Sequence, residues 1–458
     1  MRYSDESLPE SFRSVKLDKL RGVFPRLLTF MGPAFLVSVG YMDPGNWATD
    51  LEAGARYGYR LLWVVLLSSL MAIFLQILCV RVGLVTGRDL AQLCRDQFRK
   101  PYAMALWILA ELAIIACDLA EVIGSAIALQ LLFHIPLVIG VLITTLDVLL
   151  LLSFTKLGFR RLESIILTLV TTIFACFAFQ MVVSKPDLAL AVRGMVIPTI
   201  PDSQALLILV GIIGATVMPH NLYLHSSIVQ TRAFERTKLG ILEAIRSNTF
   251  DTIVALGFAF SVNAALLILA GTILEGRVEL IHDLGNVYHV LTPLLGGAAA
   301  TAFAVALLAA GQSSTITGTL AGQIVMEGFL GWKISPAKRR IVTRMIAVVP
   351  ALVLVLMFGG EGTTRMLVYS QVLLSLQLPF AVVPLILFTT NRKLMGEYAN
   401  PLWGVVISVV IASIIIGLNV YLLFKTIGLM GLFALLVIGA IVAFSLRFIK
   451  PKEKIAAQ

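Results

Sequence analysis

Apolar residues in this chain fall in long runs that short polar segments separate. A bilayer core about 30 Å thick requires about 20 consecutive apolar residues in a helix. The alternating strands of a membrane barrel are not visible, so the runs predict helices. They cover residues 27–50, 58–84, 101–132, 136–155, 161–184, 204–230, 248–273, 293–329, 342–359, 364–390, 402–424 and 427–449.

These runs predict an all-α membrane protein with about 12 transmembrane helices, or 11 if the last two runs join through the short stretch around Lys425. The composition agrees: 59% of the residues are hydrophobic and 14% are charged, whereas soluble domains have about 25% charged residues. The four cysteines have neither metal-ligand nor redox spacing. No nucleophile, catalytic dyad or cofactor loop stands out, so we expect a protein that is not an enzyme and has no cofactor.

Lysine and arginine gather after every second run, in "TGRDLAQLCRDQFRKP", "TKLGFRR", "TRAFERTK", "GWKISPAKRR", "NRK" and "RFIKPKEK". Because cytoplasmic loops carry the excess of basic residues, both termini are predicted to be cytoplasmic, in the inner (plasma) membrane. This placement explains the net charge of +10 without a nucleic-acid partner. We expect a cytoplasmic segment over 1–25, a core over 26–391, accessory helices over 392–449 and a cytoplasmic tail over 450–458.

Two of the runs are interrupted by polar residues at membrane depth. "DPGN" (43–46) lies in the first run and "MPHN" (218–221) in the sixth, and both have the pattern x-Pro-x-Asn. Proline removes a backbone donor and clashes with the carbonyl four residues back. Pro44, Gly45 and Pro219 are therefore expected to break their helices.

The break in the first run could also be an ordinary helix start, because Asp43 suits an N-cap and Pro44 a first helical residue. The run before Asp43 would reach roughly 24 Å at about 1.5 Å per residue, short of the roughly 30 Å required. The crossing must therefore continue beyond the break, and Asp43 can be both a cap and a site residue.

The spacing of the two breaks predicts an internal repeat, with spans 1–5 and 6–10 as two copies over about 26–184 and 204–391. Five spans is an odd number, so the second copy is inverted relative to the first. Inverted repeats with a matched pair of interrupted helices indicate a substrate site near the middle of the membrane.

The residues at the breaks favour a metal cation as the substrate. Carboxylate Asp43, the amide oxygen of Asn46, the thioether of Met218 and carbonyls freed near Gly214 and Ala215 are expected to converge. Mg²⁺ and Ca²⁺ prefer oxygen ligands alone, whereas a thioether favours softer transition metals. One carboxylate compensates only half of a divalent charge, which suits a carrier that must release its cargo. Met218 could alternatively be a packing residue.

"DPGNW" and "MPHN" resemble the signature motifs of the Nramp (natural resistance-associated macrophage protein) family of divalent-metal transporters. The stretches "GQSSTITGTLAGQIVMEGF" (311–329) and "SQVLLSLQLPFA" (370–381) resemble further motifs of that family, so the resemblance covers nearly the whole chain. It implies a LeuT-like fold of two inverted five-helix repeats with alternating access. It also implies proton-coupled import of Mn²⁺ or Fe²⁺, with Cd²⁺ and Co²⁺ as further cargo.

The family's metal ligands correspond to Asp43, Asn46, Met218 and the carbonyl of Ala215, and in some states to two more residues, Gly40 and Gln371. Related magnesium carriers replace the methionine, so its presence here argues against Mg²⁺ and Ca²⁺ transport. Many bacterial members have eleven spans, and the twelfth expected here lies beyond both repeats.

Proton coupling needs titratable groups within the membrane. Asp118 and Glu121 lie three residues apart, on one face of the third span, and His220 follows the proline of the sixth. Arg344, in the ninth span, could neutralise a carboxylate, and Arg340 is a competing candidate for this role. The resemblance implies that the proton route follows such positions, although Asp118 and Glu121 could instead form a static ion-pair network.

Two other functions remain open at this stage. A LeuT-like amino-acid symporter would present backbone donors to a substrate carboxylate, which a carboxylate beside a thioether fits poorly. A passive metal channel can also contain broken helices, but an internal repeat in one asymmetric chain suits a carrier better. The expected partners are metal ions, protons and the lipid bilayer, with no obligate protein partner.

Overall fold

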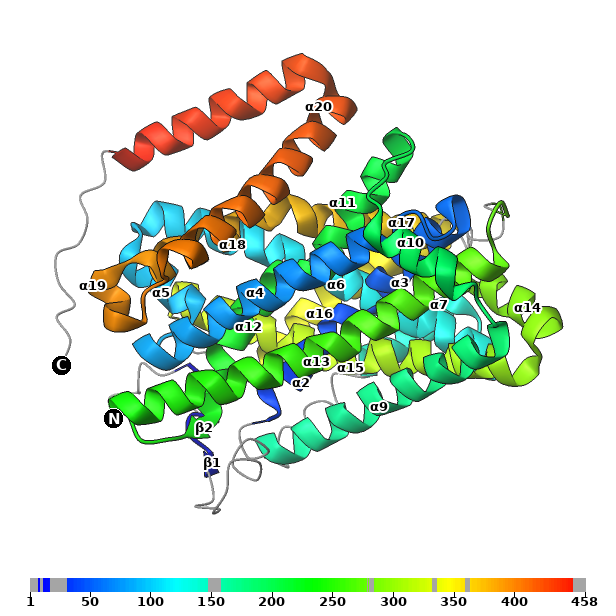
Figure 1. Cartoon of the computed structure of the whole chain (residues 1–458), viewed down its shortest axis with the longest axis horizontal. Helices are drawn as coiled ribbons and strands as arrows, with labels where there is room; N and C mark the ends of the chain where they lie inside the picture. The colour runs from blue at the N-terminus through cyan, green and yellow to red at the C-terminus, as the bar shows by residue number, and fades with distance from the viewer. Residues whose placement is uncertain are drawn as a thin grey trace.

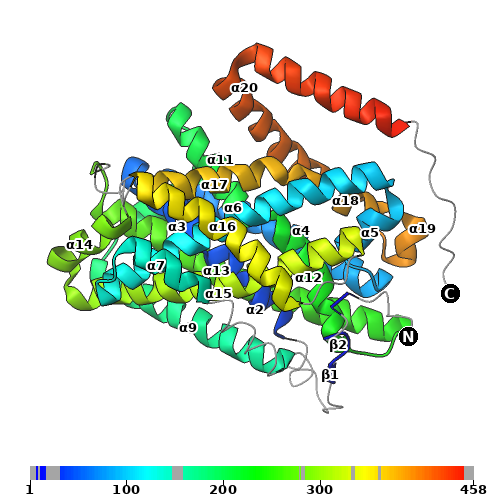
Figure 2. The same cartoon turned by 180° about the vertical axis from the view of Figure 1, so that it is seen from behind.

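Helices dominate the structure, a computed structural model that describes residues 7–8, 11–16, 31–146, 158–277, 279, 284–331, 336–358 and 363–447. Most helices run along the long axis of the molecule (Figures 1 and 2). The predicted tail over 450–458 and the predicted boundary near 25 lie outside the described residues.

The first predicted repeat is preceded by a short strand, β1. Among its described residues, the repeat contains the interrupted first span, three longer helices, a short apolar helical segment over Leu137–Leu146 and one short connecting helix. The elements in chain order are β1 (Val15–Lys16), α2 (Pro33–Ser38), η1 (Gly40–Met42), α3 (Pro44–Tyr57), α4 (Leu62–Thr86), α5 (Leu90–Gln97), α6 (Lys100–Phe133), α7 (Leu137–Ile143), η2 (Thr144–Leu146) and α9 (Phe159–Ser184).

Helix α10 (Leu188–Val196) connects the repeats, and the second repeat again begins with an interrupted helix. Its elements are α11 (Ser203–Val217), α12 (Pro219–Ile228), η3 (Val229–Thr231), β2 (Arg232–Ala233), α13 (Lys238–Ile273), α14 (Leu284–Leu295), α15 (Gly297–Leu330), α16 (Pro336–Phe358), α17 (Thr363–Gln377) and α18 (Pro379–Thr390). The chain continues through α19 (Arg392–Met395), η5 (Gly396–Tyr398) and α20 (Leu402–Arg447).

Each of the twelve predicted runs contains a helix. Within the described ranges, 8 helical segments are long and apolar enough to cross a membrane, and shorter apolar helices cover Pro33–Met42, Leu137–Leu146 and Arg344–Met357. The last two runs share α20, which is interrupted at Gly428, where φ is 71° and ψ is −177°. Figure 1 shows its two arms folding back on each other there.

The sixth span lies at the centre of the molecule. In its most apolar window 94% of the residues are buried, against 28% for α9 and for the first arm of α20, which face outward. The break in the first span is anchored in the same core by Trp47, whose ring packs edge-on against Phe177 of α9 and Phe303 of α15 at 5.0 and 5.2 Å. The Trp47 indole also donates a hydrogen bond to the carbonyl of Met42, 3.0 Å away, and so joins η1 to α3.

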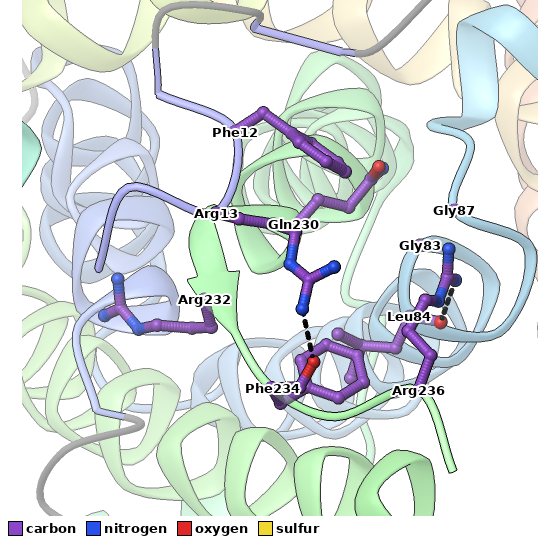
Figure 3. A pocket seen from close by; sticks show the side chains of 9 residues that line it. All are labelled: Phe12, Arg13, Gly83, Leu84, Gly87, Gln230, Arg232, Phe234 and Arg236. Carbon is purple, nitrogen blue, oxygen red and sulfur yellow. Dashed lines mark hydrogen bonds between the residues drawn. The ribbon is translucent and has the colours of Figure 1, made fainter. Parts of the chain in front are cut away.

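The N-terminal segment closes one end of the bundle. Strand β1 pairs in parallel with β2, which directly follows the sixth span. Figure 3 shows Arg13 donating to the carbonyl of Phe234 (2.7 Å) and Arg236 to that of Leu84 (2.9 Å). The cavity between these side chains measures only about 20 Å³, the size of about one water molecule. The described part of the segment therefore packs against the sixth span and β2 at this end.

A buried ion pair fixes the start of the first span at the same end. Arg232 donates to Glu163 of α9 at 2.7 Å and to the carbonyl of Met31 at 2.9 Å. Asp251 of α13 accepts the backbone N–H groups of Gly32 and Ala34 at 3.2 and 2.9 Å. These contacts hold the first turn of α2, whose N–H groups have no partner inside the helix.

Candidate metal site

The break in the first span is built by a helix cap. Asp43 has extended backbone angles (φ −67°, ψ 163°), and Pro44 is the first residue of α3. One carboxylate oxygen, Oδ1, accepts the backbone N–H of Asn46 at 2.9 Å. The side chain of Asp43 is fully buried, so a carboxylate lies inside the bundle with one oxygen committed to the helix.

The break in the sixth span has a different construction. Met218 has a positive φ (38°, ψ 106°), and no side chain caps the start of α12 at Pro219. The N–H of Met218 still donates to the carbonyl of Gly214 at 3.2 Å. The expectation that Gly214 loses its helical partner is therefore wrong. Of these two carbonyls, that of Ala215 is the one released, because the residue four positions on is proline and has no N–H.

Oxygen atoms from the two breaks converge on the side-chain amide of Asn46. Its Nδ2 donates to Asp43 Oδ1 at 2.6 Å, to the carbonyl of Ala215 at 3.1 Å and to the carbonyl of Gly40 at 3.4 Å. The two broken spans thus face each other, and three of the predicted metal-ligand atoms lie around one point.

The orientation of the Asn46 amide differs from the expectation. The nitrogen, rather than the oxygen, points at the three acceptors, because only the NH₂ end can donate to them. The amide oxygen faces Asn263 of α13, whose Nδ2 lies 3.4 Å away and also donates to the carbonyl of Tyr41 at 2.8 Å. A half-turn of the amide would present the Asn46 oxygen to a cation.

A second asparagine belongs to this group, although our sequence analysis did not select it. Asn221 Nδ2 donates to the sulfur of Met218 at 3.4 Å. It also lies so close to Gly40 that a Cβ atom at this glycine would collide with it. The spacing along the chain could have indicated Asn221. Asn46 lies two residues after its proline and Gly40 four residues before it, and Asn221 and Ala215 have the same spacing from Pro219.

Gln371 of α17 lies on the other side of the first break. Its amide occupies the space where a side chain at Gly45 would be, and a Cβ there would also lie 2.9 Å from Asp43 Oδ2. Among the hydrogen bonds of the described residues, neither Asp43 Oδ2 nor Gln371 Oε1 has a partner, and both are buried. Two oxygen acceptors are therefore available beside the Asn46 cluster.

The predicted proton residues gather along the interface of α6 and α15. A Cβ atom at Gly318 would lie 3.0 Å from Glu121 Oε1 and 3.2 Å from Asp118 Oδ1, so both carboxylates face α15. Ser314 donates to Glu121 Oε1 at 2.5 Å. Arg344 Nη1 lies 3.8 Å from Glu121 Oε2, so the predicted charge partner is in place.

Cys117 connects this interface to the sixth span. Its sulfur donates to Glu121 Oε1 at 3.6 Å and lies 3.8 Å from His220 Nε2. The cysteines lack metal-ligand spacing, so their positions along the chain did not mark Cys117 as a candidate. The informative spacing is that Cys117 stands four residues before Glu121, on the same helix face.

A cavity of about 420 Å³ lies at the opposite end of the bundle from the N-terminal segment. It is lined by residues at the outer ends of α3, α11 and α17, which include Glu52, Gln204 and Arg365. Each of these helices carries a candidate ligand further along. Among the described residues, no group of three His, Cys, Asp or Glu side chains is placed to hold a metal.

Comparisons with known proteins show which family this chain resembles. Residues 34–425 match the family model described as "Natural resistance-associated macrophage protein-like". The chain belongs to the Nramp family. Two proteins described as divalent metal cation transporter MntH are similar over most of their length. The one from a Nostoc species is 51% identical over 92% of this chain and 96% of its own, and the one from Xanthomonas campestris pv. campestris is 52% identical over 93% and 97%.

Solved structures confirm the predicted fold. The Eremococcus coleocola manganese transporter, in complex with an aromatic bis-isothiourea substituted compound, superposes with a TM-score of 0.88 at 35% identity, covering 97% of this chain and 100% of its own. Mhp1, a nucleobase-cation-symport-1 family transporter, shares the fold with a TM-score of 0.57 at 15% identity, covering 86% and 93%. This Nramp protein is thus a LeuT-like membrane transporter, and the expectation that it is not an enzyme is confirmed by its family.

Proposed function

We propose that this Nramp protein imports divalent transition-metal ions, chiefly Mn²⁺ and Fe²⁺ and also Cd²⁺ and Co²⁺, by proton-coupled alternating access. The observation that carries the proposal is the convergence of oxygen atoms from both broken spans on the Asn46 amide. The MntH relatives and the manganese transporter of similar structure support this class of ion.

The donor set matches the chemistry of such an ion. Asp43 supplies one negative charge, and the carbonyls of Gly40 and Ala215 supply neutral oxygens. A cation entering between them would replace the NH₂ group of Asn46, which now satisfies the same acceptors. The amide could then rotate and add its oxygen as a further ligand. Met218 would supply the soft donor that disfavours Ca²⁺ and Mg²⁺.

The proton would travel beside the metal rather than through its ligands. His220 is adjacent to the proline of the sixth span, and Cys117 lies between it and Glu121. Glu121 and Asp118 face α15 together, with Arg344 as the nearby positive charge. Metal binding at Asp43 would thereby be coupled to proton movement along α6.

The route of the metal follows from the two ends of the bundle. The N-terminal segment and the Arg232–Glu163 pair close one end, whereas the cavity of about 420 Å³ opens at the other. The basic segments between spans 2 and 3 and after span 10 share the closed end, which we assign to the cytoplasm together with both termini. The metal would enter through the cavity.

A liposome experiment tests the proposal. The full chain is reconstituted, and Mn²⁺ entry and internal pH are followed together in wild type, Asp118→Asn and Glu111→Gln. We expect wild type to acidify the lumen as Mn²⁺ enters, and Asp118→Asn to keep part of the uptake without the acidification. Glu111 is a matched control, a carboxylate on the same helix that accepts the Trp107 indole N–H at 3.0 Å; its variant should behave like wild type.

Two results would contradict the proposal. Mn²⁺ entry without acidification in wild type would indicate a passive channel. Normal acidification in Asp118→Asn would remove this carboxylate from the proton route.

A further inference from the structure

A second large cavity lies where α6 begins and α15 ends. It measures about 670 Å³ and is bordered by the end of α5, the first turn of α6 and the last residues of α15. Figures 1 and 2 both show α5 at the end of the molecule that holds the N-terminal segment and α19, far from α14. The cavity is therefore at one membrane surface and remote from the candidate metal site.

One part of the cavity wall is positively charged. Arg95 of α5, Arg99 and Lys100 line it, and none of its described lining residues is acidic. Asp96, in the same segment, accepts from Arg95 Nε at 3.3 Å and lies 3.9 Å from Arg88 Nε, and Arg95 Nη1 donates to the carbonyl of Glu327 at 3.5 Å. Lys100 begins the 34-residue helix α6, whose first turn contains no acidic side chain. This part of the wall suits a phosphate group, which the positive end of a helix also favours.

Apart from Gln97, the rest of the wall is apolar and continues toward the lipid-facing side of α6. Phe98, Met104 and Phe329 line it, and the Phe98 ring packs against Tyr102 at 4.9 Å. Beyond the cavity, Ile108 and Leu112 continue from Met104 at steps of four residues, and they are 48% and 49% exposed. Residues four apart lie on one face of a helix. An apolar stripe of about 12 Å at about 1.5 Å per residue thus runs from the cavity along α6.

We propose that this cavity binds the headgroup of an anionic phospholipid, with the phosphate at Arg99 and Lys100 and an acyl chain along Met104, Ile108 and Leu112. A free phosphate ion would use the basic wall but not the stripe. A basic pocket between transmembrane helices at the membrane surface is a known setting for anionic lipid headgroups. The proposal does not depend on which ion the protein carries.

Such a lipid would stabilise α6, the helix that carries the predicted proton residues Asp118 and Glu121. Asp118 and Glu121 lie further along α6 and face α15. The cavity joins these same two helices at their ends. A headgroup held there would resist their separation, so binding should be visible as thermal stabilisation of the whole protein.

The test uses the full chain in neutral detergent. Melting temperature and lipid retention by native mass spectrometry are measured during titration with phosphatidylglycerol, phosphatidylcholine or inorganic phosphate. The proteins are wild type, Arg99→Gln/Lys100→Gln and the matched control Arg392→Gln/Lys393→Gln. The control removes the same charge from two basic residues that are consecutive in the sequence of α19, and both are exposed. A further variant, Ile108→Ser, interrupts the stripe without changing charge.

We expect wild type to be stabilised by phosphatidylglycerol far more than by phosphatidylcholine. Arg99→Gln/Lys100→Gln should bind phosphatidylglycerol about 30-fold more weakly, the effect of two basic residues at a membrane surface. The control pair should behave like wild type, and Ile108→Ser should bind the lipid more weakly. Equal stabilisation by the two lipids, or equal loss in both double variants, would overturn the proposal. If inorganic phosphate displaced phosphatidylglycerol at equal concentration, the cavity would be a site for a phosphate ion and the lipid proposal would be wrong.

Discussion

The two broken spans use the same sequence register but are held open differently. Gly40, Asp43, Pro44 and Asn46 correspond in spacing to Ala215, Met218, Pro219 and Asn221. Across the site each asparagine reaches the other break, since Asn46 donates to the carbonyl of Ala215 and Asn221 packs against Gly40. The repeat therefore supplies a near-symmetric backbone frame.

The difference lies at the residue before each proline. Asp43 is a helix cap in ordinary extended conformation, with a local hydrogen bond that stabilises the break. Met218 adopts a positive φ that is costly for a residue with a side chain, about 1–3 kcal/mol, and caps nothing. The first break is thus stabilised by its own sequence, and the second by the packing of a span whose most apolar window is 94% buried. In the proposed ligand set, one repeat would contribute a hard charged ligand and the other a soft neutral one.

Removing the charge from the first break should have the largest effect. In Asp43→Asn the side-chain oxygen can still cap α3, so the break persists while the carboxylate is lost. We expect Mn²⁺ affinity to fall by more than about 100-fold, because even loss of an outer partner of a metal ligand costs about 10–100-fold. Isothermal titration of the purified protein with Mn²⁺ measures this. An affinity within tenfold of wild type would mean that the carboxylate is not a ligand.

Removing the sulfur from the second break should change selectivity more than affinity. Met218→Leu keeps the volume of the side chain, which belongs to a buried cluster that includes Cys117 and Leu374. We expect Mn²⁺ affinity to fall about tenfold, which corresponds to about 1.4 kcal/mol, and Ca²⁺ to become an effective competitor. The change in selectivity is measured by adding Ca²⁺ or Mg²⁺ as a competitor of Mn²⁺ uptake in liposomes. Unchanged exclusion of Ca²⁺ would show that Met218 is only a packing residue.

The smallest effect should come from the asparagine that supports the soft ligand. Asn221→Ala removes one hydrogen bond to sulfur, and buried hydrogen bonds are worth about 1 kcal/mol. A decrease of about fivefold in Mn²⁺ affinity is therefore expected. Asn46→Ala is the paired variant and should lose more, since Asn46 contacts three oxygens. Equal losses would mean that the two asparagines have equivalent roles at the site.

The long apolar runs were enough to predict the spans, because burying a helix in lipid requires apolar side chains along its whole length. The prolines of "DPGN" and "MPHN" were enough to predict the breaks, since proline lacks the N–H that a helix needs. Asp43 and Pro44 form a cap whose geometry is local, and that too follows from neighbouring residues alone.

Tertiary structure decided which groups meet. The sequence alone did not predict that Asn46 would turn its nitrogen toward Ala215, or that Asn263 of α13 would face its oxygen, because these contacts join residues more than 160 positions apart. The position of Cys117 beside the candidate proton residues depends on the packing of α6 against the sixth span. This packing places its sulfur between His220 and Glu121. A pattern along the chain shows which side chains share a helix face. Which face of another helix they contact depends on the packing of the whole bundle.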